Sequence, residues 1–177
     1  MRPPADEARI HALARALGRV AREPARMYLT GGATAVLEGW RAATVDVDVR
    51  FEPESDELLR ELVQQKERLR INVELASPPD FIPALPGWRE RSPLVFRSGN
   101  VYVHHFDPYS QALSKVERGF VHDMDDVRSM LTTGLVDPRQ LKELFAAIEP
   151  QLYRYPAIDP AAFRRRLDDA LRPTEGS

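Results

Sequence analysis

The sequence predicts a mixed α/β fold with a helical C-terminal lobe, and two observations support this prediction. In the first two thirds of the chain, short segments of strand type are interspersed with segments of helical periodicity. From Pro108 onward, only segments of helical type follow. We therefore expect a single domain over residues 1–177, with an α/β core over about 1–106 and a helical part over about 107–173.

The composition is that of an ordinary globular protein, with 43% hydrophobic and 29% charged residues. No apolar run approaches the ~20 residues that a membrane span needs, so we expect no membrane association. The absence of cysteine excludes disulfides, thiolate zinc sites and cysteine nucleophiles, and it fits a cytoplasmic location. With a formal net charge of −2, any contact with nucleic acid has to come from a local basic patch, and we expect none with DNA.

The chain up to residue 75 alternates between segments of helical type and segments of strand type. Apolar residues recur at helical spacing in the first segment, and Pro24 ends that run. The segment TVDVDVRF alternates strictly between apolar and polar residues, which is typical of a strand with one buried face. The expected elements are helices over 5–22, 33–40 and 53–69 and strands over 26–30, 44–51 and 71–75.

A proline-rich segment, residues 76–92, separates these elements from the rest of the chain. A loop of this length is unusual in a compact domain and is often functional. The next two strands are expected to form a hairpin. Asp137-Pro138 and Asp159-Pro160 have the pattern of a helix N-cap followed by proline. The expected elements are strands over 94–97 and 101–105 and helices over 108–118, 122–132, 137–148 and 159–171.

The clearest functional candidate is the sequence VDVDV at residues 45–49. Successive side chains of a strand point to opposite faces, so Val45 and the two valines after it are expected to face the core. Asp46 and Asp48 then share the other face, ~7 Å apart along the strand. Two like charges repel each other unless a cation binds them, and Mg²⁺ prefers carboxylate and phosphate oxygens. The alternative is a solvent-facing edge strand with two incidental acids.

The second candidate is the Gly31-Gly32 turn, which lies between a strand and a short helix. Glycine lets a phosphate approach the backbone closely, and N–H groups without a partner are available where a helix begins. Thr34 would add a hydroxyl. The alternative is a plain strand-to-helix turn, but a Gly-Gly turn followed about fourteen residues later by a two-aspartate strand is a more specific signal than either feature alone.

Two segments resemble known families. LTGGATAVLEGWRAATVDVDV resembles the opening of the polymerase-beta-type nucleotidyltransferase superfamily: a strand, a Gly-Gly or Gly-Ser turn, a helix, and a strand that bears Asp-x-Asp. DPYSQALSKVERGFVHDMDDVRSML resembles AbiEii-like nucleotidyltransferases, which include bacterial toxin components. In those proteins a helix carries a lysine, a short basic segment follows, and the next helix begins Asp-x-x-Asp-hydrophobic. The resemblance covers most of residues 28–131 and implies a nucleotidyltransferase-like mixed sheet flanked by helices.

The resemblance implies a role for each matching residue of the first segment. Gly31 and Gly32 would cradle the triphosphate of an NTP, with Thr34 beside them. Asp46 and Asp48 would hold Mg²⁺ or Mn²⁺ and act in catalysis.

Catalytically complete members of the superfamily carry a third strand acid. Glu74 is the best candidate for this metal-binding and catalytic position, although Asp is more usual there, and Asp80 is a weaker choice. In the second segment, Lys115 would contact phosphate or base, and Asp123 and Asp126 would position it or complete the pocket floor. Read without the resemblance, the lysine is a solvated helix residue and the two acids are the favoured charges of a first helical turn.

The function that the resemblance implies is the transfer of a nucleoside monophosphate from an NTP to an acceptor, with release of pyrophosphate. The acceptor would be an RNA such as tRNA, a protein or a small molecule, and the likeness to toxin components implies a cognate antitoxin. Two alternatives stay open. One is a module on the same fold that binds nucleotide or a partner without turnover, and the other is a toxin–antitoxin component that acts mainly through protein contacts.

Overall fold

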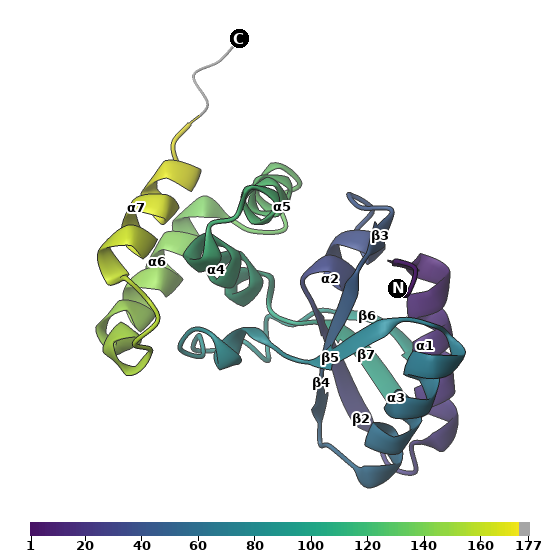
Figure 1. Cartoon of the computed structure of the whole chain (residues 1–177). Helices are drawn as coiled ribbons and strands as arrows, with labels where there is room; N and C mark the ends of the chain where they lie inside the picture. The colour runs from purple at the N-terminus through teal and green to yellow at the C-terminus, as the bar shows by residue number, and fades with distance from the viewer. Residues whose placement is uncertain (174–177) are drawn as a thin grey trace. The chain divides into compact units, whose positions relative to one another are not determined.

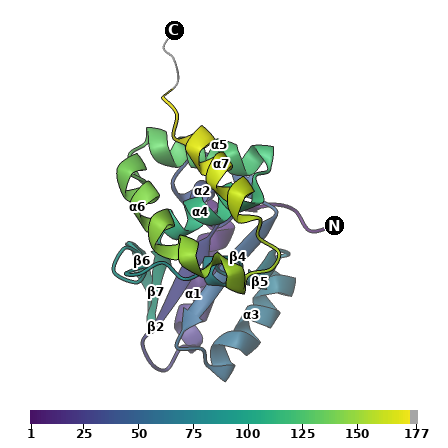
Figure 2. The same cartoon turned by 90° about the vertical axis from the view of Figure 1, so that its left-hand side faces the viewer.

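The computed structural model describes residues 1–173, which fall into two compact units. Figures 1 and 2 show a sheet with its helices in unit 1 and a helical unit 2. Unit 1 consists of Met1–Ser77 and Ser92–Phe106, and unit 2 consists of Pro78–Arg91 and the chain from Asp107 onward. Within residues 1–173, no helix has the length and apolar character that crossing a membrane requires.

A five-stranded mixed sheet forms the centre of unit 1. In the order β5-β4-β2-β7-β6, β2 pairs antiparallel with β4 and parallel with β7. β5 runs parallel to β4, and β6 forms an antiparallel hairpin with β7. The mixed α/β fold and the helical C-terminal region are therefore confirmed. The strands are β2 (Ala25–Thr30), β4 (Asp46–Glu52), β5 (Asn72–Leu75), β6 (Leu94–Ser98) and β7 (Val101–His105).

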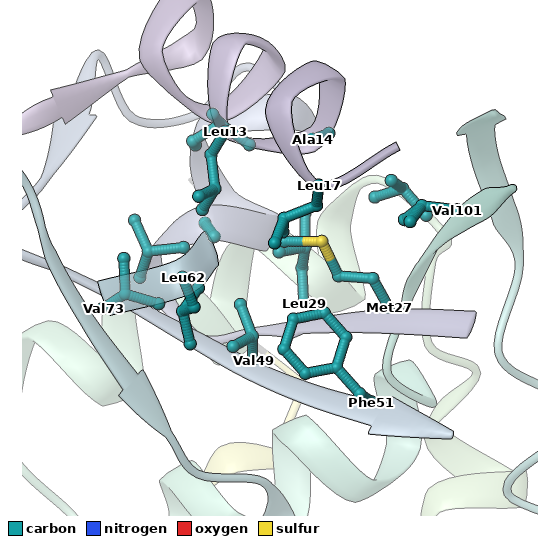
Figure 3. Packing of buried hydrophobic residues seen from close by; sticks show 14 of the residues in the cluster. Leu13, Ala14, Leu17, Met27, Leu29, Val49, Phe51, Leu62, Val73 and Val101 are labelled. Carbon is teal, nitrogen blue, oxygen red and sulfur yellow. The ribbon is translucent and has the colours of Figure 1, made fainter. Parts of the chain in front are cut away.

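Two helices, α1 (Glu7–Val20) and α3 (Asp56–Arg68), cover one face of this sheet (Figure 1). Alternate residues of the strands point to this face, and each large apolar side chain buried there contributes ~1.5–3 kcal/mol. The acids of β4 consequently point to the opposite face. The core residues labelled in Figure 3 include Leu13 and Leu17 of α1, Leu62 of α3, and Met27, Leu29, Val49, Phe51 and Val73 of the strands.

The short helix α2 (Gly32–Leu37) follows β2 directly and ends in a Schellman motif. The amide of Gly39 donates to the carbonyl of Val36, and the amide of Trp40 donates to the carbonyl of Ala35. Gly39 has a φ of 88°, a conformation that strongly favours glycine. The motif reverses the chain, so that the short strand β3 (Ala43–Thr44) returns against α2 and pairs with β1 (Ala5–Asp6).

The strand predicted over 44–51 is in fact divided. β3 ends at Thr44 and β4 begins at Asp46, which leaves Val45 between them with 66% of its surface exposed. The prediction that Val45 shares the buried face with the next two valines is therefore wrong. The physical reason is local: the hydroxyl of Thr44 donates to the carbonyl of Asp46 at 2.9 Å, a contact that competes with a continuous strand.

Three helices of unit 2 are capped by aspartates. Asp107, Asp137 and Asp159 each accept backbone N–H groups at a helix start that also carries proline, as predicted for the last two. The rings of Phe145 and Phe163 pack edge to face with centroids 4.9 Å apart. The helical elements are η1 (Pro78–Asp80), α4 (Pro108–Arg118), α5 (Val121–Thr132), α6 (Pro138–Ile148), η2 (Glu149–Arg154) and α7 (Pro160–Ala170).

Most of the proline-rich segment belongs to unit 2. Arg91 holds the buried carboxylate of Asp107 with two hydrogen bonds, Nε to Oδ1 at 3.1 Å and Nη2 to Oδ2 at 2.8 Å. This paired geometry is the strongest that arginine makes with a carboxylate. Ile82 and Leu85 in the same segment are buried. The segment is therefore a packed part of unit 2, fastened to the start of α4.

Helix α1 touches the β6–β7 hairpin at two glycines. A Cβ on Gly18 would lie 2.2 Å from the carbonyl oxygen of Ser98, and a Cβ on Gly99 would lie 2.3 Å from the carbonyl oxygen of Gly18. Both obstacles are backbone atoms, which cannot rotate away as a side chain can. The close approach of helix and hairpin therefore requires glycine at both positions.

We predict that Gly18→Ala destabilises the protein by about 2 kcal/mol or more, because the added methyl group forces the helix away from the hairpin. Helix propensity alone predicts the opposite sign, a gain of ~1 kcal/mol. Urea unfolding followed by circular dichroism measures the difference, with Arg19→Ala at the next, exposed position of α1 as the control. A stabilised Gly18→Ala variant would contradict the contact.

Candidate functional site

The polar face of the sheet presents two rows of side chains where β2 ends and β4 and β5 begin. In the first row, Thr30, Asp48 and Glu74 are opposite one another on three neighbouring strands. In the second row, Asp46 is opposite Asn72. Neighbouring strands lie ~4.8 Å apart, so Asp46, Asp48 and Glu74 lie on the same part of this face, although they are not gathered closely enough to form a metal-binding group among the described residues. Asp46 and Asp48 are half-buried, whereas Glu74 is exposed on the edge strand β5.

The Gly31-Gly32 turn directly follows Thr30, the residue that β2 contributes to the first row. Gly31 has a φ of 67°, and a Cβ on it would lie 3.4 Å from Oδ2 of Asp48. The turn that was predicted to cradle phosphate therefore lies directly beside a carboxylate that was predicted to hold metal. Because the φ of Gly31 lies in the left-handed region, glycine is the residue that suits this position beside Asp48.

Thr44 fastens the same turn to the first aspartate. A Cβ on Gly32 would lie 2.0 Å from Oγ1 of Thr44, so the threonine packs directly on the glycine backbone. The hydroxyl of Thr44 donates to the carbonyl of Asp46, as described above. One buried side chain thus fixes both the turn and the start of the acidic strand.

Arg41 also lies at this turn, and sequence reasoning missed it. Its Nη1 would be 3.2 Å from a Cβ on Gly32, which places the guanidinium against the turn. The sequence contains one indication of this contact, Gly39, because a glycine directly after a helix is typical of a reversal in chain direction. Gly39 alone does not indicate that the reversal brings the side chain of Arg41 back to the Gly31-Gly32 turn.

Thr34 is buried, and its hydroxyl contacts other groups of unit 1. Oγ1 lies 3.0 Å from Nδ1 of His105 and 3.3 Å from the carbonyl oxygen of Leu29. Nε2 of His105 lies 2.9 Å from the carboxylate of Glu38. Since a carboxylate only accepts, Nε2 carries the proton, and the threonine hydroxyl then has two acceptors within hydrogen-bond distance, Nδ1 and the carbonyl oxygen of Leu29. Thr34 thus holds α2 against β7 behind the turn.

Burial lowers the pKa of His105 below its ordinary value of 6.5. The Glu38 carboxylate opposes this shift, and the neighbouring His104 adds to it. The dominance of burial means that the ring is held neutral between α2 and β7.

The acidic rows have the donor chemistry of a divalent-cation site. Asp46 and Asp48 offer carboxylate oxygens, which are the ligands that Mg²⁺ prefers. Within residues 1–173, no three His, Cys, Asp or Glu side chains are gathered closely enough to form a metal-binding group. A cation held by the two aspartates would therefore complete its coordination with phosphate oxygens and water, as Mg²⁺ usually does. With the glycine turn beside Asp48, the donor chemistry of these residues fits a cation bound together with a phosphorylated substrate.

Thr30, in the row of Asp48, has the one side-chain hydroxyl that is buried without a hydrogen-bond partner among the described residues. An unsatisfied buried hydroxyl costs ~1–3 kcal/mol. Such a group is commonly explained by a water molecule, an ion or a ligand. Its position at the end of β2, beside the glycine turn, is the position where the substrate is expected.

The remaining predicted site residues lie in unit 2. Lys115 of α4 is buried, with Nζ 2.7 Å from Oδ2 of Asp126 and 3.8 Å from Oδ1 of Asp123 on α5. Arg118 donates to the same oxygen of Asp123 at 2.6 Å. The structure therefore brings the lysine and both acids together as one ionic cluster between two helices. Asp80, the weaker choice for a third acid, lies in η1 of unit 2 and not on the sheet.

One comparison with known proteins gives a match. Residues 8–159 match the model of a family described as "Nucleotidyltransferase of unknown function (DUF6036)". No curated protein and no solved structure gives a significant match. The family match agrees with the resemblance at the level of nucleotidyltransferases, and the narrower likeness to AbiEii-like proteins stays a prediction.

We predict that the protein loses stability as the pH falls below about 6.5, the ordinary pKa of histidine. The folded state lowers the pKa of His105, so the unfolded chain takes up the proton first and is favoured as the pH drops toward the folded pKa. Urea unfolding between pH 5 and 8 measures the slope. His105→Gln should reduce it, and a slope that His105→Gln leaves unchanged would contradict the prediction.

We further predict that Lys115→Met destabilises the protein by about 3 kcal/mol, because the buried carboxylate of Asp126 loses the ammonium that lies 2.7 Å away. Adding Asp126→Leu should restore part of the loss, since no buried charge then remains in the pair. Urea unfolding of the single and double variants measures both effects. A loss below about 1 kcal/mol for Lys115→Met, the range of a surface ion pair, would contradict a buried cluster.

Proposed function

The chain belongs to the nucleotidyltransferase family DUF6036, and on this premise we propose that it transfers a nucleoside monophosphate from an NTP to an acceptor, with Asp46 and Asp48 as the metal-binding carboxylates. The family membership implies an NTP substrate, and enzymes of this kind use Mg²⁺ or Mn²⁺. One observation of the structure carries the assignment of the residues: the Gly31 turn lies beside Oδ2 of Asp48. A phosphate at the turn and a cation on the aspartates would then contact each other.

The proposed reaction makes one bond and breaks another. The acceptor oxygen forms a bond to the α-phosphorus of the NTP, and the bond from that phosphorus to the oxygen that bridges it to the β-phosphorus breaks. Pyrophosphate leaves with the electron pair of the broken bond. The proton of the acceptor hydroxyl passes to a carboxylate oxygen, for which we assign Glu74 because it lies opposite Asp48. A bound Mg²⁺ supplies positive charge that stabilises the triphosphate and the leaving pyrophosphate.

The chain's own residues hold this geometry in place. The backbone of the Gly31-Gly32 turn would contact phosphate, and Thr44 keeps the turn fixed relative to Asp46. Thr34 supports the turn from behind through His105. Lys115, with Asp123 and Asp126, remains our proposal for a further contact to phosphate or base, on the resemblance alone.

The proposal extends to the class of acceptor. RNA such as tRNA, a protein and a small molecule are the classes that the resemblance suggests. The likeness to AbiEii-like proteins supports a toxin with a cognate antitoxin, and the composition supports a cytoplasmic location. We also propose that residues 1–177 act as one nucleotidyltransferase-like domain.

A second function is favoured by a specific observation. Residues 1–173 contain no gathered group of three acids that would form a metal site. On this basis the same fold would bind nucleotide or a partner without turnover. Calorimetry with Mg²⁺ and each of the four NTPs measures binding, and an assay of the same mixture for pyrophosphate measures turnover. A binding module binds nucleotide and forms no pyrophosphate.

We predict Mg²⁺-dependent labelling of an acceptor when the protein is incubated with α-labelled NTPs, total RNA and cell lysate. Asp46→Asn combined with Asp48→Asn should lower the labelling by on the order of 100-fold or more, because the triphosphate loses its charge stabilisation. Asp56→Asn, which removes an exposed acid of α3 on the opposite face of the sheet, is the matched control. Equal labelling by the wild type and the double variant with all four NTPs would exclude the proposed enzyme.

A further inference from the structure

We propose that Arg41 binds the β- and γ-phosphates of the NTP at the glycine turn, where its guanidinium lies at Gly32 and the carboxylate of Asp48 lies at Gly31. This inference rests on the proposed function, because it assigns a new contact to the same substrate. Neither the family match nor the predicted motif assigns a role to this residue.

The position of Arg41 follows from the end of α2. The Schellman motif at Gly39 reverses the chain, and the amide of Arg41 donates to the carbonyl of Ala35 at 3.2 Å. The backbone of residue 41 is thereby tied to the body of a helix that begins at Gly32. From there the side chain runs back to the turn, where Nη1 would be 3.2 Å from a Cβ on Gly32. The guanidinium occupies the space that a side chain at position 32 would need.

The two glycines of the turn therefore face opposite charges. Gly32 lies against the guanidinium of Arg41, and Gly31 lies against Oδ2 of Asp48. A ligand that contacts both the arginine and a cation on the aspartates must present negative charge to the arginine and oxygen ligands to the cation. A polyphosphate chain meets both conditions, because every phosphate presents anionic oxygens.

The chemistry of guanidinium suits this position. Arginine stays charged at every physiological pH, and its planar group of N–H donors matches the oxygens of a phosphate in pairs. Negative charge grows on the pyrophosphate as the bond to the α-phosphorus breaks, and a fixed cation near the leaving group stabilises it. Arg41 is half-buried, which strengthens this interaction relative to open water.

A purely structural role is the competing explanation. In that case the guanidinium would only fill the space beside Gly32 and Thr44, and its removal would affect folding without affecting phosphate binding. The two explanations differ in what they predict for a ligand that has phosphates and no nucleobase.

The experiment is isothermal titration calorimetry of the full chain with inorganic tripolyphosphate in the presence of Mg²⁺, which avoids the choice of a nucleobase. Wild-type protein should bind, and Arg41→Gln should bind ~10–100-fold more weakly, the loss expected for charge-assisted hydrogen bonds. Arg41→Lys should lie between the two, because it keeps the charge and loses the paired donors. Arg60→Gln, an exposed arginine of α3, is the matched control and should bind as wild type does.

The loss should depend on the number of phosphates. In competition titrations with NMP and NTP of the same base, Arg41→Gln should weaken NTP binding and leave NMP binding unchanged. Thermal unfolding followed by circular dichroism identifies a variant that does not fold, and in that case Arg41→Lys carries the comparison. Equal affinity of the folded variant and wild type for tripolyphosphate, or an equal loss for NMP and NTP, would overturn the assignment. Wild-type protein that binds neither tripolyphosphate nor any NTP would overturn the proposed function itself.

Discussion

The antiparallel pairing of β2 with β4 is the constraint on which the rest of the site depends. This pairing places Thr30 opposite Asp48 and at the same time places Leu29 opposite Val49 in the core. Side chains alternate along a strand, so a shift by one residue would bury the aspartates and expose the valines. The free energy of burying the apolar face therefore also holds the acids on the polar face. Function and stability are linked here through the geometry of a single strand.

The second feature of the site is how closely backbone segments approach one another. Thr44 packs on the backbone of Gly32 and donates to Asp46, while Asp48 lies against Gly31. The contact at Gly32 depends on the missing side chain, because a methyl group there would lie 2.0 Å from Oγ1 of Thr44. Precise spacing of this kind suits phosphoryl-type chemistry, in which positioning and charge do most of the work. The glycine turn is thus a packing requirement of unit 1 as well as a candidate phosphate site.

The charged groups of the two units are arranged differently. In unit 2, Lys115 has the carboxylates of Asp126 and Asp123 around its ammonium, inside a pair of helices. Buried ions are tolerated when they are paired in this way, although Oδ2 of Asp123 has no hydrogen-bond partner among the described residues. In unit 1, Asp46 and Asp48 lie as like charges on one strand face, and the buried hydroxyl of Thr30 has no partner within the described residues. Unit 1 is the candidate site because Thr30 lies in the row of Asp48, next to the glycine turn.

The sequence by itself determined the order and type of the main elements, the Gly-Gly turn and the alternation that puts Asp46 and Asp48 on one face. These features are local: they depend on periodicity, caps and turn residues within a few positions of one another. The exception, Val45, was also local, because a threonine hydroxyl bonded to the backbone two residues later ended the strand.

Only the tertiary structure decided which distant residues meet. It brought Arg41 back to Gly32, set Glu74 beside Asp48, directed the hydroxyl of Thr34 toward His105, and packed the proline-rich segment into unit 2. Each of these contacts depends on strand register or on the direction that a chain takes after a turn. Both are fixed by how the whole core packs, and no short stretch of sequence carries that information.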